Sequence, residues 1–500
     1  MTKAKQLDRI CAVVAAETAA EMQAQLRQGL RLTKTAELRL DWLRSDGERH
    51  RFLDWLKRRR FSAQLIATCR RREAGGRFRG DVEAERRALA AAVEAGCGWY
   101  DLEIESVKAA GRFKPVAPAR AAAIVSLHRF GRAVSEPQKL LERFQLAPGT
   151  IWKLAVECRG LGDAVRLIRL ARKPGAAAGI IAVPMGRAAL ATRFLALREG
   201  SLLSYAAVSA RTAPGQPTLA TAVREYHAER VDRRTRAYGI LGNKARHSVS
   251  PAMHNAAFAA EGINAVYLPF QVEHLRDFVE AIEPLGIGGF SVTIPHKRAI
   301  LRHLDSCDSL ARRLGAVNTV VIRRGRRYGY NTDYAGVLAA LAGRVQLAGS
   351  RVLLVGAGGA ARAAAFAIAD SGARVFVLAR RPAQARELAH LAGGKAVARG
   401  EIRRRSFDLI VNATPVGMAP DRASPLGASE LNAPVVFDMV YRPIETPLLR
   451  LAARRGLKRI SGVEMLVAQG VAQWELWTGR PAPAQVMRRA VLEALRRDEV

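Results

Sequence analysis

The sequence predicts an α/β protein that opens with a (β/α)8 barrel and continues with further α/β domains. Two observations carry this prediction. Eight short apolar runs alternate with helix-like segments over the first 230 residues, and a strand, a glycine turn and a helix follow one another in "VLLVGAGGAARAAA", residues 352–365. Strands that alternate with helices are typical of barrels and doubly wound sheets. A chain of 500 residues has room for two to four domains.

The eight apolar runs have the length of strands and fairly even spacing. Most are separated by segments with apolar residues three or four positions apart, such as "DVEAERRALAAAVEAG", residues 81–96. The connection 106–120 is short and broken by proline, so a helix is only weakly indicated there. Eight alternations favour a barrel over a doubly wound sheet, the structural alternative. The runs are residues 10–15, 36–43, 64–69, 99–105, 122–127, 151–156, 179–185 and 203–210.

Composition excludes several classes of protein. No apolar run approaches the eighteen residues of a membrane span, and strand-like sequence begins within ten residues of the start, so no signal or transit peptide is expected. The five cysteines are scattered without a C-x-x-C pair, which favours a reducing cytoplasm and argues against disulfides or a metal site.

The net charge of +35 raises the question of nucleic-acid binding. Only 13 of the 80 basic residues are lysine, and the arginines are spread over the whole chain without a basic tail or helix. We therefore expect a compositional preference for arginine and some binding of anionic substrates, with no nucleic-acid partner.

Polar residues lie within or just after several of the predicted barrel strands, where barrel enzymes place their chemistry. A lone buried lysine is usually ion-paired, and a lone histidine is usually structural. Their convergence with acids and arginines on one barrel mouth favours catalysis, because an amine in a dry pocket beside cations loses its proton more easily and attacks ketones. The residues are Glu37, Arg39, Arg70, Glu103, His128, Lys153 and the loop 211–218.

The motifs "ELRLD", "IATCRRREAGG", "YDLEIE", "IVSLHRF", "WKLAVEC" and "TAPGQPT" resemble type I 3-dehydroquinate dehydratase over residues 10–230. The resemblance implies that Lys153 forms an imine with the substrate ketone and that His128 is the general acid and base. It also implies that six further residues hold the substrate carboxylate and hydroxyls: Glu37, Arg39, Arg70, Arg193, Thr212 and Gln216.

One position departs from this family. Its members usually read E-G-G after the third strand, and the glutamate assists the histidine. Here Ala74 occupies that place and Glu73 falls one residue early. Either Glu73 substitutes by a local shift or this support is missing.

The second half begins after the polar segment "DRRTRA", residues 232–237, which we interpret as a linker. Taken singly, its motifs have ordinary explanations. Ser248 and Ser250 could cap a helix, Lys297 could be a surface lysine, and Asp333 could cap the next helix.

In order along the chain, however, the motifs resemble shikimate dehydrogenase over residues 237–500. They are "YGILGNKARHSVSPAMHNAAF", "GGFSVTIPHKRAIL", "GAVNTVV", "YGYNTDYAGVLAAL", "NATPVGM", "DMVYRPIETPLL" and "GVEMLVAQGVAQWELWTG".

This second resemblance implies that Lys297 gives a proton to the developing alkoxide and that Asp333 holds Lys297. His296 is interpreted as structural, because neighbours on a strand face opposite ways. The family commonly has asparagine where this chain has Ser291, so one substrate hydrogen bond is expected to pass through water. The implied substrate-binding residues are Ser248, Ser250, Thr293, Asn318, Tyr441 and Gln469.

The glycine turn fits G-x-G-x-x-A through Gly356, Gly358 and Ala361 and predicts a dinucleotide pyrophosphate at a helix N-terminus. Arg380 and Arg381 follow the next predicted strand, 373–379, where NAD-binding folds carry an acid. Arginine there favours the 2′-phosphate of NADP. The predicted cofactor-binding residues are Gly356, Ala357, Gly358, Gly359, Ala360, Arg380, Arg381, Asn412, Thr414 and Met439.

Together the resemblances imply a fused enzyme of the shikimate pathway, in which the first half makes the substrate of the second. Two alternatives stay open: the second half acts on quinate, or the barrel is a degenerate, non-catalytic module. The expected domains are the barrel at 1–232, the substrate-binding domain at 237–338 with the C-terminal helices 463–500, and the NADP-binding domain at 339–462.

Overall fold

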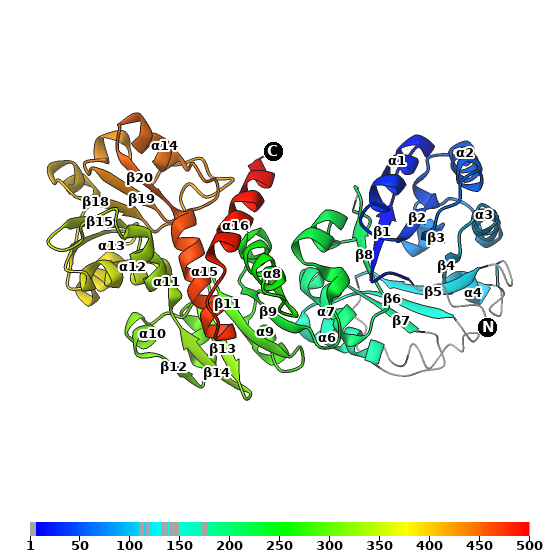
Figure 1. Ribbon diagram of the computed structural model, residues 1–500, viewed down its shortest axis with the longest axis horizontal. Helices are drawn as coiled ribbons and strands as arrows, with labels where there is room; N and C mark the ends of the chain where they lie inside the picture. The colour runs from blue at the N-terminus through cyan, green and yellow to red at the C-terminus, as the bar shows by residue number, and fades with distance from the viewer. Residues whose placement is uncertain are drawn as a thin grey trace. The chain divides into compact units, whose positions relative to one another are not determined.

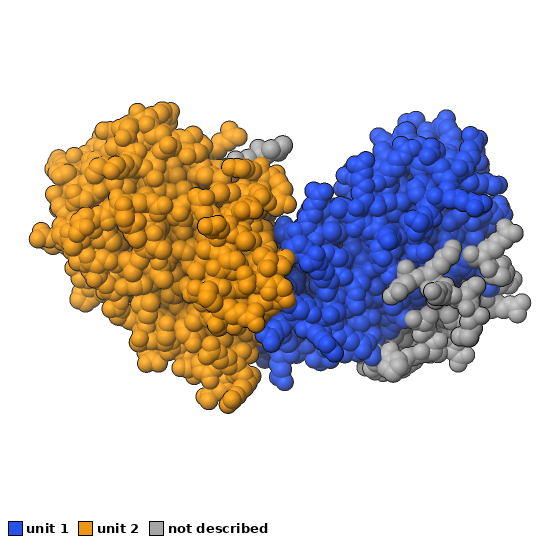
Figure 2. Space-filling view, in the orientation of Figure 1, with its two compact units in different colours: residues 1–237, 264–286 blue, residues 238–263, 287–500 orange. Residues whose placement is uncertain are grey.

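The computed structural model describes residues 7–109, 115–116, 121–131, 139, 150–172, 179–209 and 211–499. The chain divides into two compact units, residues 1–237 with 264–286 and residues 238–263 with 287–500 (Figure 2). Within the described ranges, no helix combines the length and apolar character needed to cross a membrane.

The first sheet has eight strands in the order β7-β6-β5-β4-β3-β2-β1-β8, and all seven of its strand pairs are parallel (Figure 1). All eight predicted runs form strands, which confirms the (β/α)8 barrel, and the last run extends beyond the described residues at 210. The strands are β1 (Ile10–Val14), β2 (Thr35–Arg39), β3 (Gln64–Thr68), β4 (Trp99–Glu103), β5 (Ala122–Arg129), β6 (Ile151–Glu157), β7 (Gly179–Met185) and β8 (Ser204–Ala207).

The barrel is nearly closed, with β7 and β8 at the two ends of its hydrogen-bonded ladder. Two bonds link the segment before β8 to β7: the Leu202 N–H donates to the Ile180 carbonyl at 3.0 Å, and the Ser201 hydroxyl accepts from the Ala182 N–H at 3.1 Å. The eight strand ends therefore converge on one face, where side chains from opposite strands meet.

Helices connect most barrel strands. Side-chain oxygens of Thr18, Ser45 and Asp81 accept backbone N–H groups at the starts of three of them, which explains where those helices begin. The weakly indicated connection 106–120 holds the short helix α4, and the rest of it lies largely outside the described residues. The helices are α1 (Ala19–Gly29), α2 (Asp46–Lys57), α3 (Val82–Glu94), α4 (Ile104–Ala109), α6 (Leu161–Arg169) and α7 (Ala189–Glu199).

The second sheet is mixed and has the order β10-β9-β11-β13-β14-β12. β13 pairs antiparallel with both β11 and β14, whereas β12 pairs parallel with β14. Its strands and helices are β9 (Arg236–Leu241), α8 (Ser250–Ala260), β10 (Ala265–Phe270), α9 (Leu275–Ala281), β11 (Ile287–Val292), β12 (Ser306–Cys307), α10 (Ser309–Leu314), β13 (Thr319–Arg323), β14 (Arg326–Tyr330) and α11 (Thr332–Leu341).

The third sheet is parallel and has the order β17-β16-β15-β18-β19-β20, which is the Rossmann arrangement. The strand order reverses between β15 and β18, and the glycine turn leaves β15 at this point. The elements are β15 (Arg351–Val355), α12 (Gly359–Asp370), β16 (Arg374–Leu378), α13 (Pro382–Leu391), β17 (Lys395–Ala396), β18 (Leu409–Asn412), β19 (Val435–Asp438), α14 (Pro447–Arg454) and β20 (Lys458–Ser461).

Two helices end the chain, α15 (Gly462–Thr478) and α16 (Ala484–Glu499). α15 packs against α11, β11 and β13, and α16 packs against α8. The C-terminal helices therefore return to the second sheet after the third sheet is complete.

Candidate active sites

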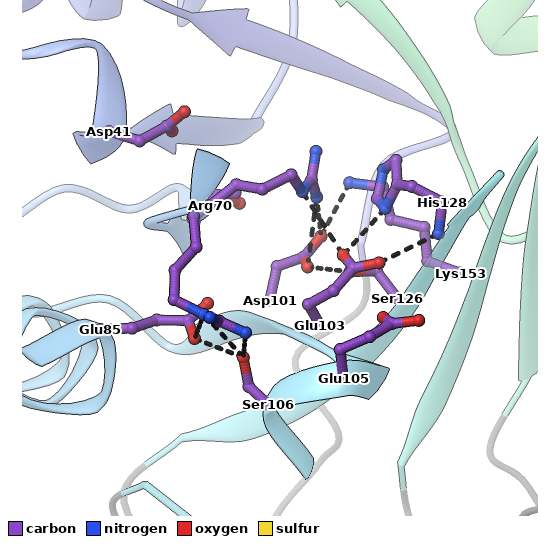
Figure 3. A network of polar contacts seen from close by, with 12 residues as sticks. Asp41, Arg70, Glu85, Asp101, Glu103, Glu105, Ser106, Ser126, His128 and Lys153 are labelled. Carbon is purple, nitrogen blue, oxygen red and sulfur yellow. Dashed lines mark hydrogen bonds and ion pairs between the residues drawn. The ribbon is translucent and has the colours of Figure 1, made fainter. Parts of the chain in front are cut away.

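The barrel interior carries a cluster of polar side chains because strand alternation turns every second residue inward. β4 contributes Asp101 and Glu103, β5 contributes Ser126 and His128, and β6 contributes Lys153, all drawn in Figure 3. Apolar residues fill the rest of the interior, among them Ile66, Ile124, Ile181 and Val183. Charged groups in such surroundings are stable only when they pair with one another.

Lys153 is buried and lies between two carboxylates. Its Nζ donates to Glu37 Oε1 at 3.0 Å and to Asp101 Oδ2 at 2.7 Å, and the whole residue is 4 % exposed. Burial by itself raises the pKa of Asp101, but Lys153 and Arg70 outweigh it and hold that pKa well below its usual range. The sequence predicts that both acids and cations converge on this amine. The inward faces of β2 and β4 bring the carboxylates to the nitrogen, and Arg70 lies 3.4 Å from the same Asp101.

His128 forms a pair with Glu103. Its Nδ1 lies 2.9 Å from Glu103 Oε2, and its backbone N–H donates to Glu103 Oε1 at 3.0 Å. Burial and then Arg70 lower the pKa of His128, and Glu103 only partly offsets them. The imidazole is therefore neutral near pH 7 and can accept a proton, while the carboxylate fixes the ring.

The two pairs belong to one network. Ser126 Oγ lies 2.6 Å from Asp101 Oδ1 and 2.8 Å from Glu103 Oε2 and donates its one proton to either, so it links the carboxylates of the lysine and the histidine (Figure 3). Arg70 approaches the same carboxylates at 3.4 and 3.5 Å. Sequence reasoning missed Asp101 and Ser126, although Asp101 stands two residues before Glu103 in "WYDLEIE" and must share its face.

The other predicted barrel residues have partners of their own; Arg39, Arg193 and Gln216 are buried and Thr212 is half-buried. Arg39 makes a two-point ion pair with Asp41, at 2.9 and 2.8 Å. Arg193, on α7, donates to the carbonyls of Pro184 and Pro214 at 3.0 and 3.3 Å and so reaches the loop that follows β8. In that loop, Gln216 Oε1 accepts from the backbone and hydroxyl of Thr212 at 2.8 and 3.2 Å.

Glu73 does not take the place of the glutamate that the family carries at the position of Ala74. Its side chain is 72 % exposed and pairs with Arg71 at 3.5 Å. The short 3-10 turn Arg72–Ala74 directs it to solvent, and His128 keeps Glu103 as its acidic partner.

The second site centres on Lys297 and Asp333, which form an ion pair. Asp333 also accepts from Asn318 Nδ2 at 2.8 Å and is buried. The two ordinary explanations considered from sequence are wrong here: Asn331 caps α11 in place of Asp333, and the Lys297 side chain is only 15 % exposed. The pair therefore has the arrangement of a held proton donor.

The predicted substrate hydroxyls lie near the start of α8. Ser248 Oγ donates to Ser250 Oγ at 3.0 Å and accepts from the backbone N–H of Ser250, the first residue of α8, at 3.1 Å. The N-cap residue is Val249, so neither serine is the N-cap itself, although Ser248 bonds to the first N–H of the helix. Burial raises the pKa of Tyr441, partly offset by a hydrogen bond with Ser248. Thr293 bonds through its backbone to Leu241.

α15 contributes two glutamines to this region. Gln469 is buried and donates to the Leu466 carbonyl at 2.8 Å. Gln473, which sequence reasoning missed, accepts from Ser291 Oγ at 2.9 Å and donates to Thr319 Oγ1 at 3.1 Å. Ser291 therefore has a hydrogen-bond partner within the protein, Gln473, which the sequence analysis did not expect. The only signal for Gln473 in the sequence is its position as a polar residue on an otherwise apolar helix face in "LVAQGVAQW".

The glycine turn after β15 adjoins Lys297. Gly356 has φ +122°, and a Cβ on it would lie 3.0 Å from the Ala413 carbonyl, so only glycine fits. α12 begins at Gly359 after the N-cap Gly358, without a side-chain cap, and runs through Ala360. A Cβ on Gly359 would lie 3.3 Å from Lys297 Cδ. Ala357, between the glycines, packs against the core below the turn.

The remaining predicted cofactor residues surround the strand ends. Asn412 Oδ1 accepts from the backbone N–H and the hydroxyl of Thr414 at 3.0 and 2.7 Å. The backbone carbonyl of Asn412 accepts from the Met439 N–H at 3.0 Å. Arg380 and Arg381 follow β16 and are exposed; among the described residues, no carboxylate is found in an ion pair with either. Free guanidiniums at this edge fit a phosphate.

Comparison with known proteins gives matches over both halves. The model "Type I 3-dehydroquinase" matches residues 10–233, "Shikimate dehydrogenase substrate binding domain" matches 240–320, and "Shikimate 5'-dehydrogenase C-terminal domain" matches 462–492.

Individual relatives cover the same regions. A bifunctional 3-dehydroquinate dehydratase/shikimate dehydrogenase, chloroplastic, from Arabidopsis thaliana is 32% identical over 95% of this chain and 83% of its own. A shikimate dehydrogenase (NADP(+)) from Methanopyrus kandleri is 46% identical over 53% of this chain and 98% of its own. The crystal structure of a chorismate mutase/shikimate 5-dehydrogenase fusion protein from Clostridium acetobutylicum has a TM-score of 0.50 and 31% identity, and the match covers 53% of this chain and 100% of that one.

Proposed function

The chain belongs to the family of bifunctional 3-dehydroquinate dehydratase/shikimate dehydrogenases, and from this premise we propose the roles of its residues in two consecutive reactions. The barrel dehydrates 3-dehydroquinate to 3-dehydroshikimate, and the second half reduces that product to shikimate with NADPH. The observation that carries the proposal is the presence in one chain of two distinct polar centres, the Lys153 cluster and the Lys297–Asp333 pair beside a glycine turn.

In the first reaction, Lys153 passes one proton to a neighbouring carboxylate, and the neutral amine attacks the substrate ketone; the carbinolamine takes that proton back on its hydroxyl, which leaves as water to give a protonated imine. His128 removes the proton from the neighbouring carbon, and the electron pair moves to the imine nitrogen to give an enamine. The enamine then expels the β-hydroxyl, which leaves as water with the proton that His128 carries. Water hydrolyses the new imine and returns the lysine.

The carboxylates and arginines have separate roles in this proposal. Glu103 keeps the imidazole oriented through both proton transfers, since its two oxygens hold the ring and the backbone of His128. Glu37, Arg39, Arg70, Arg193, Thr212 and Gln216 are proposed to hold the substrate.

In the second reaction, Lys297 donates a proton to the alkoxide that develops at the ketone oxygen, and Asp333 holds the lysine for that transfer. Ser248, Ser250, Thr293, Asn318, Tyr441 and Gln469 are proposed to hold the substrate. NADP fits the chain: the Gly356 turn allows close approach, the α12 start has no side-chain cap, and Arg380 and Arg381 offer charge to a 2′-phosphate. When bound, the reduced nicotinamide supplies the hydride.

A coupled assay tests the whole proposal. Dehydroquinate and NADPH are added to the full chain, and NADPH oxidation is followed by absorbance. Lys153→Ala should abolish oxidation with dehydroquinate but leave it intact with 3-dehydroshikimate, whereas Lys297→Ala should abolish both signals. Oxidation of NADPH by dehydroquinate in the Lys153→Ala variant would contradict the assignment of the barrel.

Three other expectations belong to this proposal. The domain boundaries are 1–232, 237–338 with 463–500, and 339–462. A cytoplasmic location is supported by five free cysteine thiols. The absence of a nucleic-acid partner stays a prediction, which a filter-binding assay at low salt would check.

A further inference from the structure

Tyr205 presents its ring to the Lys153 nitrogen inside the barrel. Lys153 Nζ lies 4.1 Å from the centroid of the Tyr205 ring, and Tyr205 is 4 % exposed. The residue stands on β8, opposite Cys11 of β1, and belongs to the apolar interior. An ammonium group over the face of an aromatic ring is attracted by the ring's negative face, most strongly when both are removed from water.

The ring contact differs in kind from the two carboxylate contacts. Glu37 and Asp101 each accept an N–H from the lysine, and an ammonium has three such donors. A protonated imine has one N–H, so at least one of these hydrogen bonds is lost when the imine forms. The attraction of the ring needs no N–H and persists with any positive charge on the nitrogen.

We propose that Tyr205 is a catalytic residue of the dehydratase site and that its ring face stabilises the positive charge of the Lys153 iminium. This inference rests on the imine chemistry proposed above. Charge develops on the nitrogen twice: when the carbinolamine loses water to form the C=N bond, and when the enamine electron pair forms that bond again as the C–O bond to the β-hydroxyl breaks. In the second event His128 supplies the proton to the leaving oxygen, and the ring lowers the cost of the charge that remains.

The Tyr205 hydroxyl has no part in this role. It is buried, and among the described residues no group forms a hydrogen bond with it. Burial, and next the charge of Glu37, raises the pKa of Tyr205 well above its ordinary value, so the ring remains a neutral phenol. Removal of an unpaired buried hydroxyl breaks no bond, so Tyr205→Phe is a clean variant that keeps the ring.

The experiment compares Tyr205→Phe with Tyr205→Leu in the full chain. Two quantities are measured with saturating dehydroquinate: kcat of dehydration, and the fraction of chain that borohydride traps as an adduct on Lys153. Tyr205→Phe should stay within about twofold of the wild type, and Tyr205→Leu should lose about tenfold in both quantities. Tyr100→Leu is the matched control, because it removes a buried tyrosine from the outward side of β4 and should leave trapping unchanged.

A second series of variants tests the proposal even if Tyr205→Leu fails to fold. Phenylalanines with one, two and three fluorines at position 205 keep the shape of the ring and weaken its negative face stepwise. The logarithms of kcat and of the trapped fraction should fall with each fluorine, which a purely structural role would not produce. A flat series with normal trapping overturns the role of Tyr205 alone, whereas absence of an adduct on Lys153 in the wild type overturns the proposed function itself.

Discussion

Lys297 lies against Gly359, the first residue of α12, so the proposed proton donor of the second site adjoins the turn that would hold the cofactor. A Cβ at position 359 would press on the lysine stem at 3.3 Å from Cδ and 3.4 Å from Cβ. The residue type at this helix start is therefore expected to affect the position of the Lys297 side chain, which follows β11 of the second sheet.

Gly359→Ala should lower kcat for reduction of 3-dehydroshikimate by about tenfold, because small displacements of a reacting group are costly. Dehydration by the barrel should not change. Gly400→Ala is the control, since a Cβ there has open space. Equal reduction rates in the two variants would contradict the coupling.

Borohydride reduction in the presence of dehydroquinate should leave a stable adduct on Lys153, visible in the mass of the intact chain. His128→Ala should still form the adduct while turnover falls about 10²–10⁴-fold, because a general acid and base is lost but the nucleophile remains. Lys153→Ala should give no adduct. Dehydration that survives in Lys153→Ala would exclude the imine.

The pH profile of dehydration should follow the low pKa of His128. The neutral imidazole is the active form. We therefore expect kcat/KM to be retained at pH values below 6.5, the ordinary pKa of histidine, and to be lost only as the pH falls through the lowered pKa of His128. Glu103 is the group that raises this pKa, so Glu103→Gln should move the acid limb to still lower pH and reduce kcat. Glu105→Gln, whose carboxylate pairs with Arg129, should leave the limb in place.

The cofactor preference should depend on the two arginines after β16. The double variant Arg380→Ala/Arg381→Ala should raise KM for NADPH by about tenfold or more with little change in kcat, since a charge-assisted phosphate contact is lost. The preference over NADH should disappear. Arg374→Ala removes one positive charge at the opposite end of β16 and should retain the preference. Equal efficiency of the wild type with both cofactors would overturn the assignment.

The barrel should lose stability with rising pH through Glu85. Burial raises the pKa of this carboxyl from 4.5 to about 7, more than Ser106 and Arg71 can offset. The folded state therefore holds the proton more tightly than the unfolded chain between these values, and the free energy of unfolding falls there by up to about 1.4 kcal/mol per pH unit. Glu85→Gln should flatten that slope in urea titrations. Glu83→Gln, exposed on the same helix, should not.

The architecture could be predicted because its signals are local. Eight runs of strand length and one glycine turn each specify their element within a few residues, and Gly356 occupies the conformation that its motif requires. Lys153, His128, Lys297 and Asp333 could be named because each stands in a short recognisable segment.

The surroundings of these residues could not be predicted, since they depend on contacts between distant segments. Glu37 and Lys153 are separated by 116 positions, and Ser291 and Gln473 by 182. No periodicity encodes which strand faces which across a barrel. Strand alternation alone could have placed Asp101 inside the barrel. The position of the Tyr205 ring beside Lys153, in contrast, follows only from the pairing of β8 with β1.

The position of α15 at the end of the chain has a consequence for synthesis on the ribosome. Every described member of the Lys153 cluster precedes residue 216, and β8 completes the barrel ladder on β1, the first of the eight barrel strands along the chain. The hydrogen bond of Ser291, in contrast, can form only after Gln473 has been synthesised. Because domains fold N-terminal first as they emerge, the nascent chain assembles its dehydratase centre while the reductase centre still lacks its last helix. We therefore expect an mRNA truncated in its final fifth to yield a protein that makes dehydroshikimate and releases it unreduced.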